Sequence, residues 1–376
     1  MTRLCYYALV ALFLCGCTHK ENKNGGLPLD AQIIEIKRAN LNSKEAGLTI
    51  DHVIKLQTSD KALINQIAKV VNFKDKLYIF TAIPQNNVYI FTANGEFLYK
   101  ITKGRANNEV FYPMDISVDE KNGKVLVLDF YRNIKEFSLD GKYLASHSFP
   151  ESQFYLESVG ENNSVLLFCP NMSSKNEFTC YLKDGKTSLK GLYKTRYVGE
   201  GYQNFGALTK LNQDSVLVCP LFSDTIYLFN NKNKCLDPYY VVDCDGDSAN
   251  APGRIETFNS LQEYTQSIGE KHWFSGPKSV LLSRGKIFFN YGQNNKWGVF
   301  DSRKASLTVY ERMFDDLPNY FGKVGQDNGT IIYAYDIPWL QNHFQEYPPV
   351  TEMGKKIEAM CGNEEDNPIL VFAKIK

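Results

Sequence analysis

The stretch "ITKGRANNEVFYPMDISVDEKNGKVLVLDFYRNIKEFSLDGKYL", residues 101–144, contains the pattern that decides the fold. It holds two apolar runs typical of β-strands, "KVLVLDF" from Lys124 and "NIKEFSL" from Asn133, and then the turn pair Asp140-Gly141. An Asp-Gly pair favours a tight hairpin, because both central residues of such a turn take positive φ. The fold then depends on whether this unit recurs along the chain.

Equivalent pairs of runs recur throughout the 376 residues. The second runs are anchored on Val88, Ile134, Phe178, Ile226, Trp297 and Ile369, which lie 46, 44, 48, 71 and 72 residues apart. Spacings in the forties are typical of a four-stranded propeller blade. The sequence therefore predicts an all-β fold, a six-bladed β-propeller with two short helical insertions. We expect strands of the inner region near Leu77, Val125, Val165, Val216, Ile287 and Ile331.

The ends of a propeller must meet, because an open ring would leave unpaired strand edges. The last apolar run, "NPILVFAKIK", ends the chain. We expect "LTIDHVIKL", residues 48–56, to complete the sheet of this last blade.

The two long spacings contain apolar residues at helical intervals. One helical face comprises Ile255, Phe258, Leu261 and Ile268; a second comprises Ile337, Leu340 and Phe344 behind the cap Asp336; a third comprises Met353, Ile357 and Cys361. These insertions could form one wall over a face of the propeller. We expect Tyr264, Trp273 and Trp339 at its exposed rim, where aromatic side chains commonly anchor partners. The alternative is that these residues only pack the insertions onto the blades.

The first residues predict export. Arg3 precedes an apolar run, Leu4 to Leu14, that is too short to span a membrane and has the length of a signal-peptide core. Leu14-Cys15-Gly16-Cys17 then resembles a bacterial lipobox. We interpret residues 1–16 as a lipoprotein signal peptide, Cys17 as the lipidated residue, residues 17–30 as a polar tether and residues 31–376 as the propeller domain.

Composition excludes some partners and leaves others open. Without residues 1–16, which contain Arg3 and no acid, 41 basic and 42 acidic residues remain, so the mature chain has a net charge of −1. This balance gives no electrostatic argument for nucleic acid.

Cys169 and Cys180 flank one predicted hairpin, and we expect them to face each other; whether they form a disulfide is left open.

Few residues suggest catalysis. Asp115, Asp129 and Asn133 could point into a central channel, although Asp129 is better explained as a cap of the turn between two strands. The acidic run at residues 243–247 lacks the Gly and Glu that an EF-hand loop requires at its sixth and twelfth positions. No pair of His residues has metal-ligand spacing. We therefore predict no metal and no cofactor.

Several motifs resemble the six-bladed β-propeller lipoproteins of anaerobic gut bacteria, which are related to NHL-repeat propellers. They are the lipobox at Cys17, "ANGEFLYKITKG", "VLVLDFYRNIKEFSLDGKYL", "SDTIYLF" and "EEDNPILVFAKIK". The family's connection G-x-G-P-x-E-Y is reduced here to Gly104 and Glu109. The resemblance covers roughly residues 30 to 376. It implies the fold and a lipid anchor in the cell envelope, most simply at the outer membrane, without implying an activity.

Two functional hypotheses follow. The first is a lipid-anchored binding module that presents a propeller face to a protein, peptide or glycan. The alternative is a metal-dependent propeller hydrolase or lyase of the lactonase type. The alternative requires three or more carboxylate, Asn or His side chains that converge in the central channel.

Overall fold

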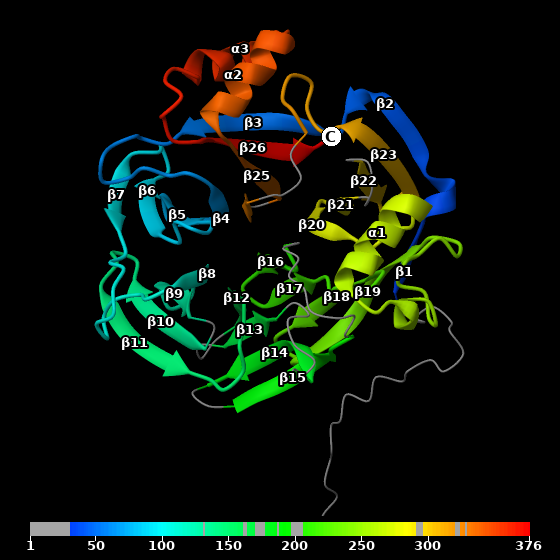
Figure 1. The fold of residues 1–376 in the computed structure, drawn as a ribbon, viewed down its shortest axis with the longest axis horizontal. Coiled ribbons are helices and arrows are strands. Elements are labelled where there is room, and N and C mark those ends of the chain that lie inside the picture. The colour runs from blue at the N-terminus through cyan, green and yellow to red at the C-terminus, as the bar shows by residue number, and fades with distance from the viewer. Residues whose placement is uncertain are drawn as a thin grey trace, which may run out of the picture.

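Antiparallel meanders of four strands are arranged around a central axis and make up most of the molecule (Figure 1). The computed structural model describes residues 31–130, 132–160, 164–169, 177–185, 188–196, 206–290, 296–319, 324–327 and 329–376. In each meander the strands run from the innermost to the outermost position in chain order. The molecule is therefore mostly β, with a propeller-like arrangement of its sheets.

Three meanders follow one another in the first half of the chain. The first contains β4 (Ile67–Phe73), β5 (Lys76–Thr81), β6 (Val88–Thr92) and β7 (Phe97–Lys100). The second contains β8 (Pro113–Asp119), β9 (Lys124–Asp129), β10 (Asn133–Ser138) and β11 (Tyr143–Ser148). The third contains β12 (Tyr155–Ser158), β13 (Val165–Phe168), β14 (Phe178–Asp184) and β15 (Ser188–Lys194).

The second half continues the same order. One meander contains β16 (Leu208–Asn212), β17 (Ser215–Val218), β18 (Thr225–Asn230) and β19 (Cys235–Asp243). The next contains β20 (Lys278–Ser283), β21 (Lys286–Asn290), β22 (Trp297–Asp301) and β23 (Ser306–Arg312). The last contains β24 (Gly325–Asp327), β25 (Thr330–Tyr335) and β26 (Ile369–Ile375). A single parallel pair, Gly325 with Val70, joins β24 to β4 and thus the last meander to the first.

The apolar runs of the sequence form the second strand of each meander, not the innermost one. Val125 lies in β9 and Ile287 in β21, and both are buried. Second strands have protein on both faces of their sheet, which favours a continuous apolar run. The strands expected in the inner region are therefore present, but each is the second strand of its meander, one position outward from the innermost strand. The innermost strands carry charged residues that line the cavity, such as Lys69 and Asp115, and so lack a continuous apolar run.

The N-terminal segment contributes a strand to three successive sheets. As predicted, β3 (Leu48–Lys55) pairs antiparallel with β26, with Val53 opposite Val371, and so closes the last meander. The sequence did not predict β1 (Gln32–Glu35) and β2 (Asn40–Ala46), which the 3-10 turn at Ile36–Arg38 connects. They pair parallel with the outermost strands β19 and β23. We call residues 32–46 the strap (Figure 1).

The helices form where the sequence predicted them. A short 3-10 helix at Ile255–Thr257 precedes α1 (Leu261–Lys271), and the two others are α2 (Ile337–Glu346) and α3 (Glu352–Met360). The Ser260 hydroxyl accepts the amide N–H of Glu263 at 3.1 Å, and the Thr351 hydroxyl accepts that of Gly354 at 3.0 Å. These bonds satisfy amides that the first helical turn leaves without partners.

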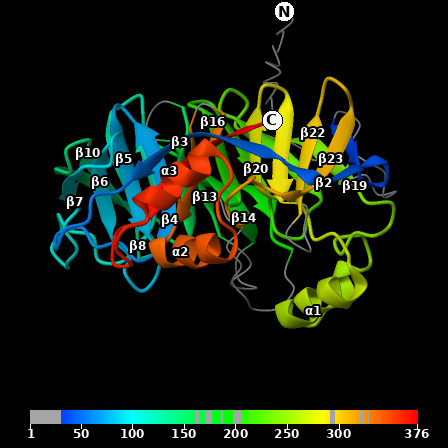
Figure 2. The ribbon, with the colours of Figure 1, turned by 90° about the horizontal axis from the view of Figure 1, so that it is seen from above.

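Helices α1 and α2 lie on the same side of the ring, and the C-terminus lies on the other (Figure 2). α1 belongs to the connection from β19 to β20, whereas α2 and α3 belong to the loop from β25 to β26. The connections between successive meanders, such as residues 101–112, reach this same side because every innermost strand begins there. We call it the loop face.

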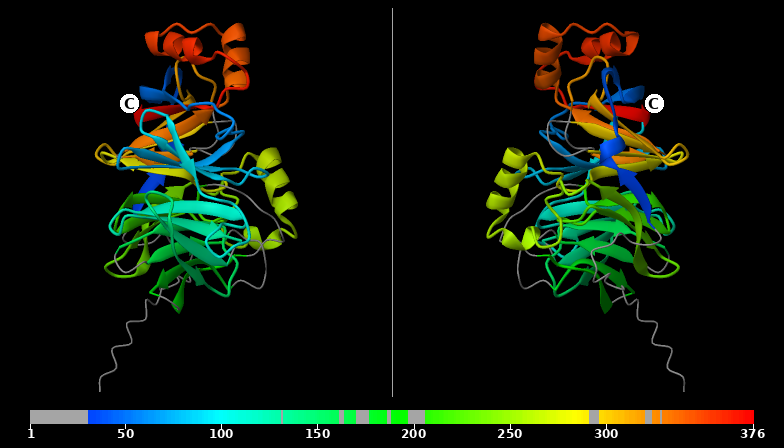
Figure 3. Two further views of the ribbon diagram at one scale, coloured as in Figure 1. Left: turned by 90° about the vertical axis from the view of Figure 1, so that its left-hand side faces the viewer. Right: turned by 90° about the vertical axis from the view of Figure 1, so that its right-hand side faces the viewer.

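The two insertions do not form one wall. α1 packs with Phe222 and Ala249, whereas α2 and α3 share a different cluster with Phe314 and Tyr335. Figure 3 shows α1 well separated from α2 and α3. The apolar stripes are nevertheless buried as expected at Ile255, Leu261, Ile337, Leu340 and Phe344.

Two truncations separate the roles of the strap and of β3. A chain that begins at residue 47 loses the strap and should remain folded with a lower thermal midpoint. A chain that begins at residue 57 also loses β3, which exposes the edge of β26, so the free energy of unfolding should fall by at least about 5 kcal/mol. Circular dichroism during heating measures both. Equal midpoints for the two truncations would contradict the closing role of β3.

Candidate functional site

A central cavity of about 1460 Å³ lies between the innermost strands. Its lining comes from β4, β8, β12, β16, β20 and β24. The lining extends from Gln66 and Pro113 at the loop face to Asp75 and Glu120 at the opposite face, so the cavity runs along the strands. A cavity with convergent polar groups is the first place to look for a site.

Lys69 connects three innermost strands across the cavity wall. Its Nζ lies 3.1 Å from Asp115 Oδ2 and 2.7 Å from Glu157 Oε1. It also donates to the Leu156 carbonyl at 3.2 Å. Asp115 accepts the amide N–H of Leu156 at 2.9 Å and that of Ile116 at 2.8 Å. Every polar atom of this cluster that is named here therefore has a partner, as burial demands.

Lys210 makes a second connection from β16. Its Nζ donates to the Val118 carbonyl and to Ser158 Oγ, both at 3.0 Å, and lies 3.1 Å from Glu120 Oε1. The side-chain amide of Gln326 in β24 donates to the Lys210 carbonyl. These contacts reach β8, β12 and β24 from one strand. They fill part of the cavity and hold strands together that share no ladder.

Burial and charge oppose each other in this cluster. Burial raises the pKa of Asp115 to about 6, although the Lys69 ammonium opposes the shift and the Glu157 carboxylate adds to it. Burial lowers the pKa of Lys69, but the two carboxylates outweigh it and raise the pKa overall. Lys69 thus stays charged. Burial also lowers the pKa of Lys278, at the loop-face end of the cavity, to about 8.

Asp115 makes stability depend on pH. Its folded-state pKa, about 6, exceeds its ordinary value of 3.8, so its contribution is complete below about pH 4 and is lost as the pH rises through 6. The free energy of unfolding of the wild type, relative to Asp115→Asn, should therefore fall by on the order of 3 kcal/mol from pH 4 to pH 7. Urea denaturation of both proteins across this range measures it. A difference that is constant with pH would refute the assignment.

Removal of the Lys69 ammonium should leave two buried carboxylates without their cation. Lys69→Met should lower the free energy of unfolding at about pH 8 by about 3 to 5 kcal/mol. Adding Asp115→Asn should restore part of this loss, because only one carboxylate then remains. Denaturant midpoints of the single and double variants test it. A Met variant as stable as the wild type would show that the cluster does not hold the strands.

Most of this cluster was not predicted from the sequence, although a signal was present. Lys69, Asp115, Glu157 and Lys210 each occupy the third position of an innermost strand. A charged residue at the same strand position in four consecutive repeats can be recognised in the sequence, but only after the innermost strands have been located. The polar character of those strands hid them from an analysis based on apolar runs.

Of the three polar residues predicted near the channel, only Asp115 lines the cavity. The Asp129 carboxylate accepts the amide N–H groups of Phe111 at 3.1 Å and Tyr112 at 2.6 Å. It thus has the structural capping role that was favoured, but it caps the connection from β7 to β8 and not the turn from β9 to β10. Asn133 accepts the Ser146 hydroxyl at 2.7 Å, on the outer strands.

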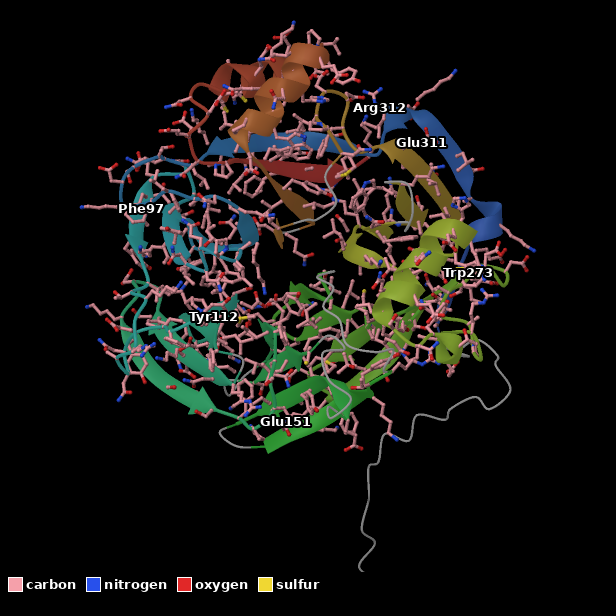
Figure 4. All side chains as sticks on the ribbon, viewed as in Figure 1. Phe97, Tyr112, Glu151, Trp273, Glu311 and Arg312 are labelled. Carbon is pink, nitrogen blue, oxygen red and sulfur yellow. The ribbon has the colours of Figure 1, made fainter. Side chains whose placement is uncertain are left out.

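The three aromatic residues predicted at an exposed rim differ in position. The exposure expected for Tyr264 is wrong: it is 2% exposed, and its hydroxyl donates to Asn250 Oδ1 at 2.7 Å. Trp273 is half-buried, with Arg254 Cζ 4.1 Å and Lys271 Nζ 4.5 Å from its ring centroid (Figure 4). Trp339 is half-buried and stacks on Tyr335 at 5.5 Å. The structure does not bring these three together.

The cysteines expected to face each other do not. Cys180 lies opposite Phe168, and the Cys169 amide donates to the Thr179 carbonyl, so the two thiols are one register position apart. Successive residues of a strand point to opposite faces, which separates the sulfur atoms. Cys180 is buried, and this burial raises the pKa of its thiol to about 12.

Within the part of the chain that the structure describes, no group of three or more His, Cys, Asp or Glu residues could hold a metal ion. The acidic run at residues 243–247 instead forms a turn in which Asp243 Oδ1 accepts the Asp245 amide at 2.9 Å. The Asp245 carboxylate is paired with Lys37 of the strap. Cys17 and the tether lie outside the described residues.

A known structure shares this fold. A protein of Bacteroides fragilis NCTC 9343 that is described as exported superimposes with a TM-score of 0.73 at 19% identity, covering 92% of this chain and 100% of its own. BamB of Moraxella catarrhalis has a TM-score of 0.42 at 11% identity, covering 77% of this chain and 72% of its own. The WD40 domain of Neurospora crassa Pan2 has a TM-score of 0.41 at 10% identity, with 71% of each chain covered.

The fold and the cavity thus define a mostly-β protein of propeller-like architecture. Residues 32–374 match the family described as a domain of unknown function, DUF4934, and the chain belongs to that family. No curated protein matches the chain. No helix among the described residues has the length and apolar character needed to span a membrane.

Proposed function

We propose that this protein is a lipid-anchored, six-bladed β-propeller of the cell envelope that binds a partner through its loop face. Each meander, with β3 completing the last, is one blade. The tether from Cys17 would connect the blades to the membrane, most simply the outer membrane. The Bacteroides fragilis protein of the same fold is described as exported, which supports an envelope location.

The observation that carries a binding function is the state of the cavity carboxylates. Lys69 lies between Asp115 and Glu157 at the position a channel cation would need. A metal-dependent hydrolase or lyase, the alternative function, would have to expel this ammonium first. The buried ion pairs instead hold the innermost strands, and the surface left for function is the loop face, where segments that carry function are commonly placed on a rigid scaffold.

Trp273 and Trp339 remain the candidates for partner contacts on the helical insertions. Arg254 and Lys271 both lie over the ring of Trp273, and Trp339 extends the buried aromatic stack of Tyr335. Large aromatic side chains with one partly accessible face are typical interface anchors. Tyr264 supports α1 from within its core and would act only by positioning it.

Fractionation tests the anchor. Cys17→Ala removes the only thiol that the lipobox pattern offers for lipidation, so the variant should be soluble or unprocessed and should take up no labelled palmitate. Leu144→Ala, an exposed substitution on β11, is the matched control and should remain in the membranes. Membrane association of the Cys17→Ala protein with retained palmitate would contradict the anchor.

Pull-down from envelope extracts tests the binding function. Immobilised wild type should enrich a defined partner, and Trp273→Ala with Trp339→Ala should reduce its recovery by about tenfold, the loss typical of interface anchors. Leu144→Ala should not. The absence of any enriched partner, with folded bait, would contradict the proposed function.

A further inference from the structure

Exposed apolar side chains gather on the loop face of the first two meanders. Ile83 is 63% exposed, Phe130 56%, Leu63 49% and Phe111 39%. All four lie on connections between strands. Leu63 lies between β3 and β4, Ile83 between β5 and β6, Phe111 between β7 and β8, and Phe130 between β9 and β10. We call them the aromatic patch. Ile83 also lines the cavity, so the patch borders its mouth.

Hydrogen bonds hold these loops as one surface. The Gln85 side chain accepts the amide N–H of Asn65 at 3.3 Å, and the Gln85 carbonyl accepts Lys103 Nζ at 3.1 Å. The Phe130 amide donates to the Tyr112 carbonyl at 2.9 Å. The four segments that carry the patch are thus linked in sequence around the cavity mouth.

The phenyl ring of Phe130 is exposed by a backbone conformation that bulky residues avoid. Its φ is 45°, a left-handed value that is costly for an aromatic residue. The bond to Tyr112 and the Arg132 amide, which donates to the Phe130 carbonyl at 2.9 Å, fix this conformation. The ring then meets Phe111 edge to face at 5.5 Å.

One cation stacks on the aromatic pair, and two more lie in the same loops. Arg105 stacks over Phe111 with its Cζ 5.2 Å from the ring centroid. Lys103 and Arg132 are exposed, and they contact the Gln85 carbonyl and the Ser152 hydroxyl. The neighbouring acid, Glu109, turns its carboxylate into its own loop, where it accepts the Ala106 amide at 3.0 Å. A Cβ at Gly104 would overlap this carboxylate, so this position of Glu109 requires glycine at residue 104.

An unsatisfied amide lies at the mouth of the cavity. Asn86, three residues after Ile83, is 0% exposed, and its side-chain oxygen and nitrogen have no hydrogen-bond partner among the described residues. It lines the cavity. Such an amide offers one acceptor and two donors, the complement of a peptide group.

We infer that the aromatic patch, with Lys103, Arg105 and Arg132, binds an extended segment of a partner protein in which acidic side chains adjoin apolar ones. Carboxylates pair with the guanidinium groups, whose geometry matches them, and apolar side chains cover the two phenyl rings. A peptide group of the partner forms hydrogen bonds with the Asn86 amide at the cavity mouth. The inference rests on the proposed binding function and gives it a surface and a partner chemistry.

A random peptide display library, selected on the immobilised wild type and depleted on Phe130→Asn, tests the inference. Asn tolerates positive φ, so this variant removes the ring and keeps the backbone. Enriched peptides should carry Asp or Glu next to aromatic or aliphatic residues. A fluorescein-labelled copy of the most enriched peptide should bind about tenfold more weakly to Phe130→Asn and about fivefold more weakly to Arg105→Glu. Leu144→Asn, the matched exposed control, should bind as the wild type does.

Other results would overturn the inference. They are an absence of enrichment, enriched peptides without acids, or equal affinity of all variants. Saturable binding of polygalacturonate without peptide enrichment would identify an anionic glycan instead. A dimer that Phe130→Asn abolishes in sedimentation velocity would identify a second copy of the chain. If these peptide experiments fail while the envelope partner is still captured, the proposed function stands and only this surface is wrong.

Discussion

The pairing of β3 with β26 is the contact on which the rest of the structure depends. The two strands come from opposite ends of the chain, and their ladder extends from Lys55 with Ile369 to Leu48 with Ile375. Because each sheet buries its faces against its neighbours, a ring that does not close exposes apolar surface at both ends. The strap extends the same principle, since it adds β1 and β2 to the outer edges of the two preceding sheets. The start of the chain therefore holds three sheets together at their outer edges. The sheets do not need to meet at the centre, where the cavity lies.

Inside the ring, charge takes the place of apolar packing. Lys69 and Lys210 reach strands of other meanders, and each ammonium meets a carboxylate at 3.1 Å or less. Buried ion pairs give little net stability, but the loss of one partner is costly. This arrangement explains why the innermost strands carry charges at the same position. It also leaves the loop face, with its exposed phenyl rings and guanidinium groups, as the surface suited to a partner.

Most of the fold could be predicted from the sequence because the repeat is local. The apolar runs, the Asp140-Gly141 turn and the helical stripes each act within about twenty residues. All three appear where expected, but in the turn only Gly141 has a positive φ, where both residues were expected to have one. The strap could not be predicted, since "NLNSKEA" is polar and becomes a strand only against the exposed edge of β23. The Cys169–Cys180 expectation failed by one register position, because the spacing of two residues in the sequence does not fix the register of a strand pair. The prediction that Tyr264 is exposed was wrong, because its ring packs within the insertion and its hydroxyl donates to Asn250 there.

The closure of the ring is tested most directly by a covalent link between its two ends. Val53 and Val371 are direct partners in the β3–β26 ladder, and paired strand residues have Cβ atoms close enough for a disulfide in favourable cases. In the protein with Val53→Cys and Val371→Cys, mild oxidation followed by peptide mapping should find these two residues linked, with a raised thermal midpoint. Two free thiols at positions 53 and 371 in the folded, oxidised protein would contradict the pairing of β3 with β26.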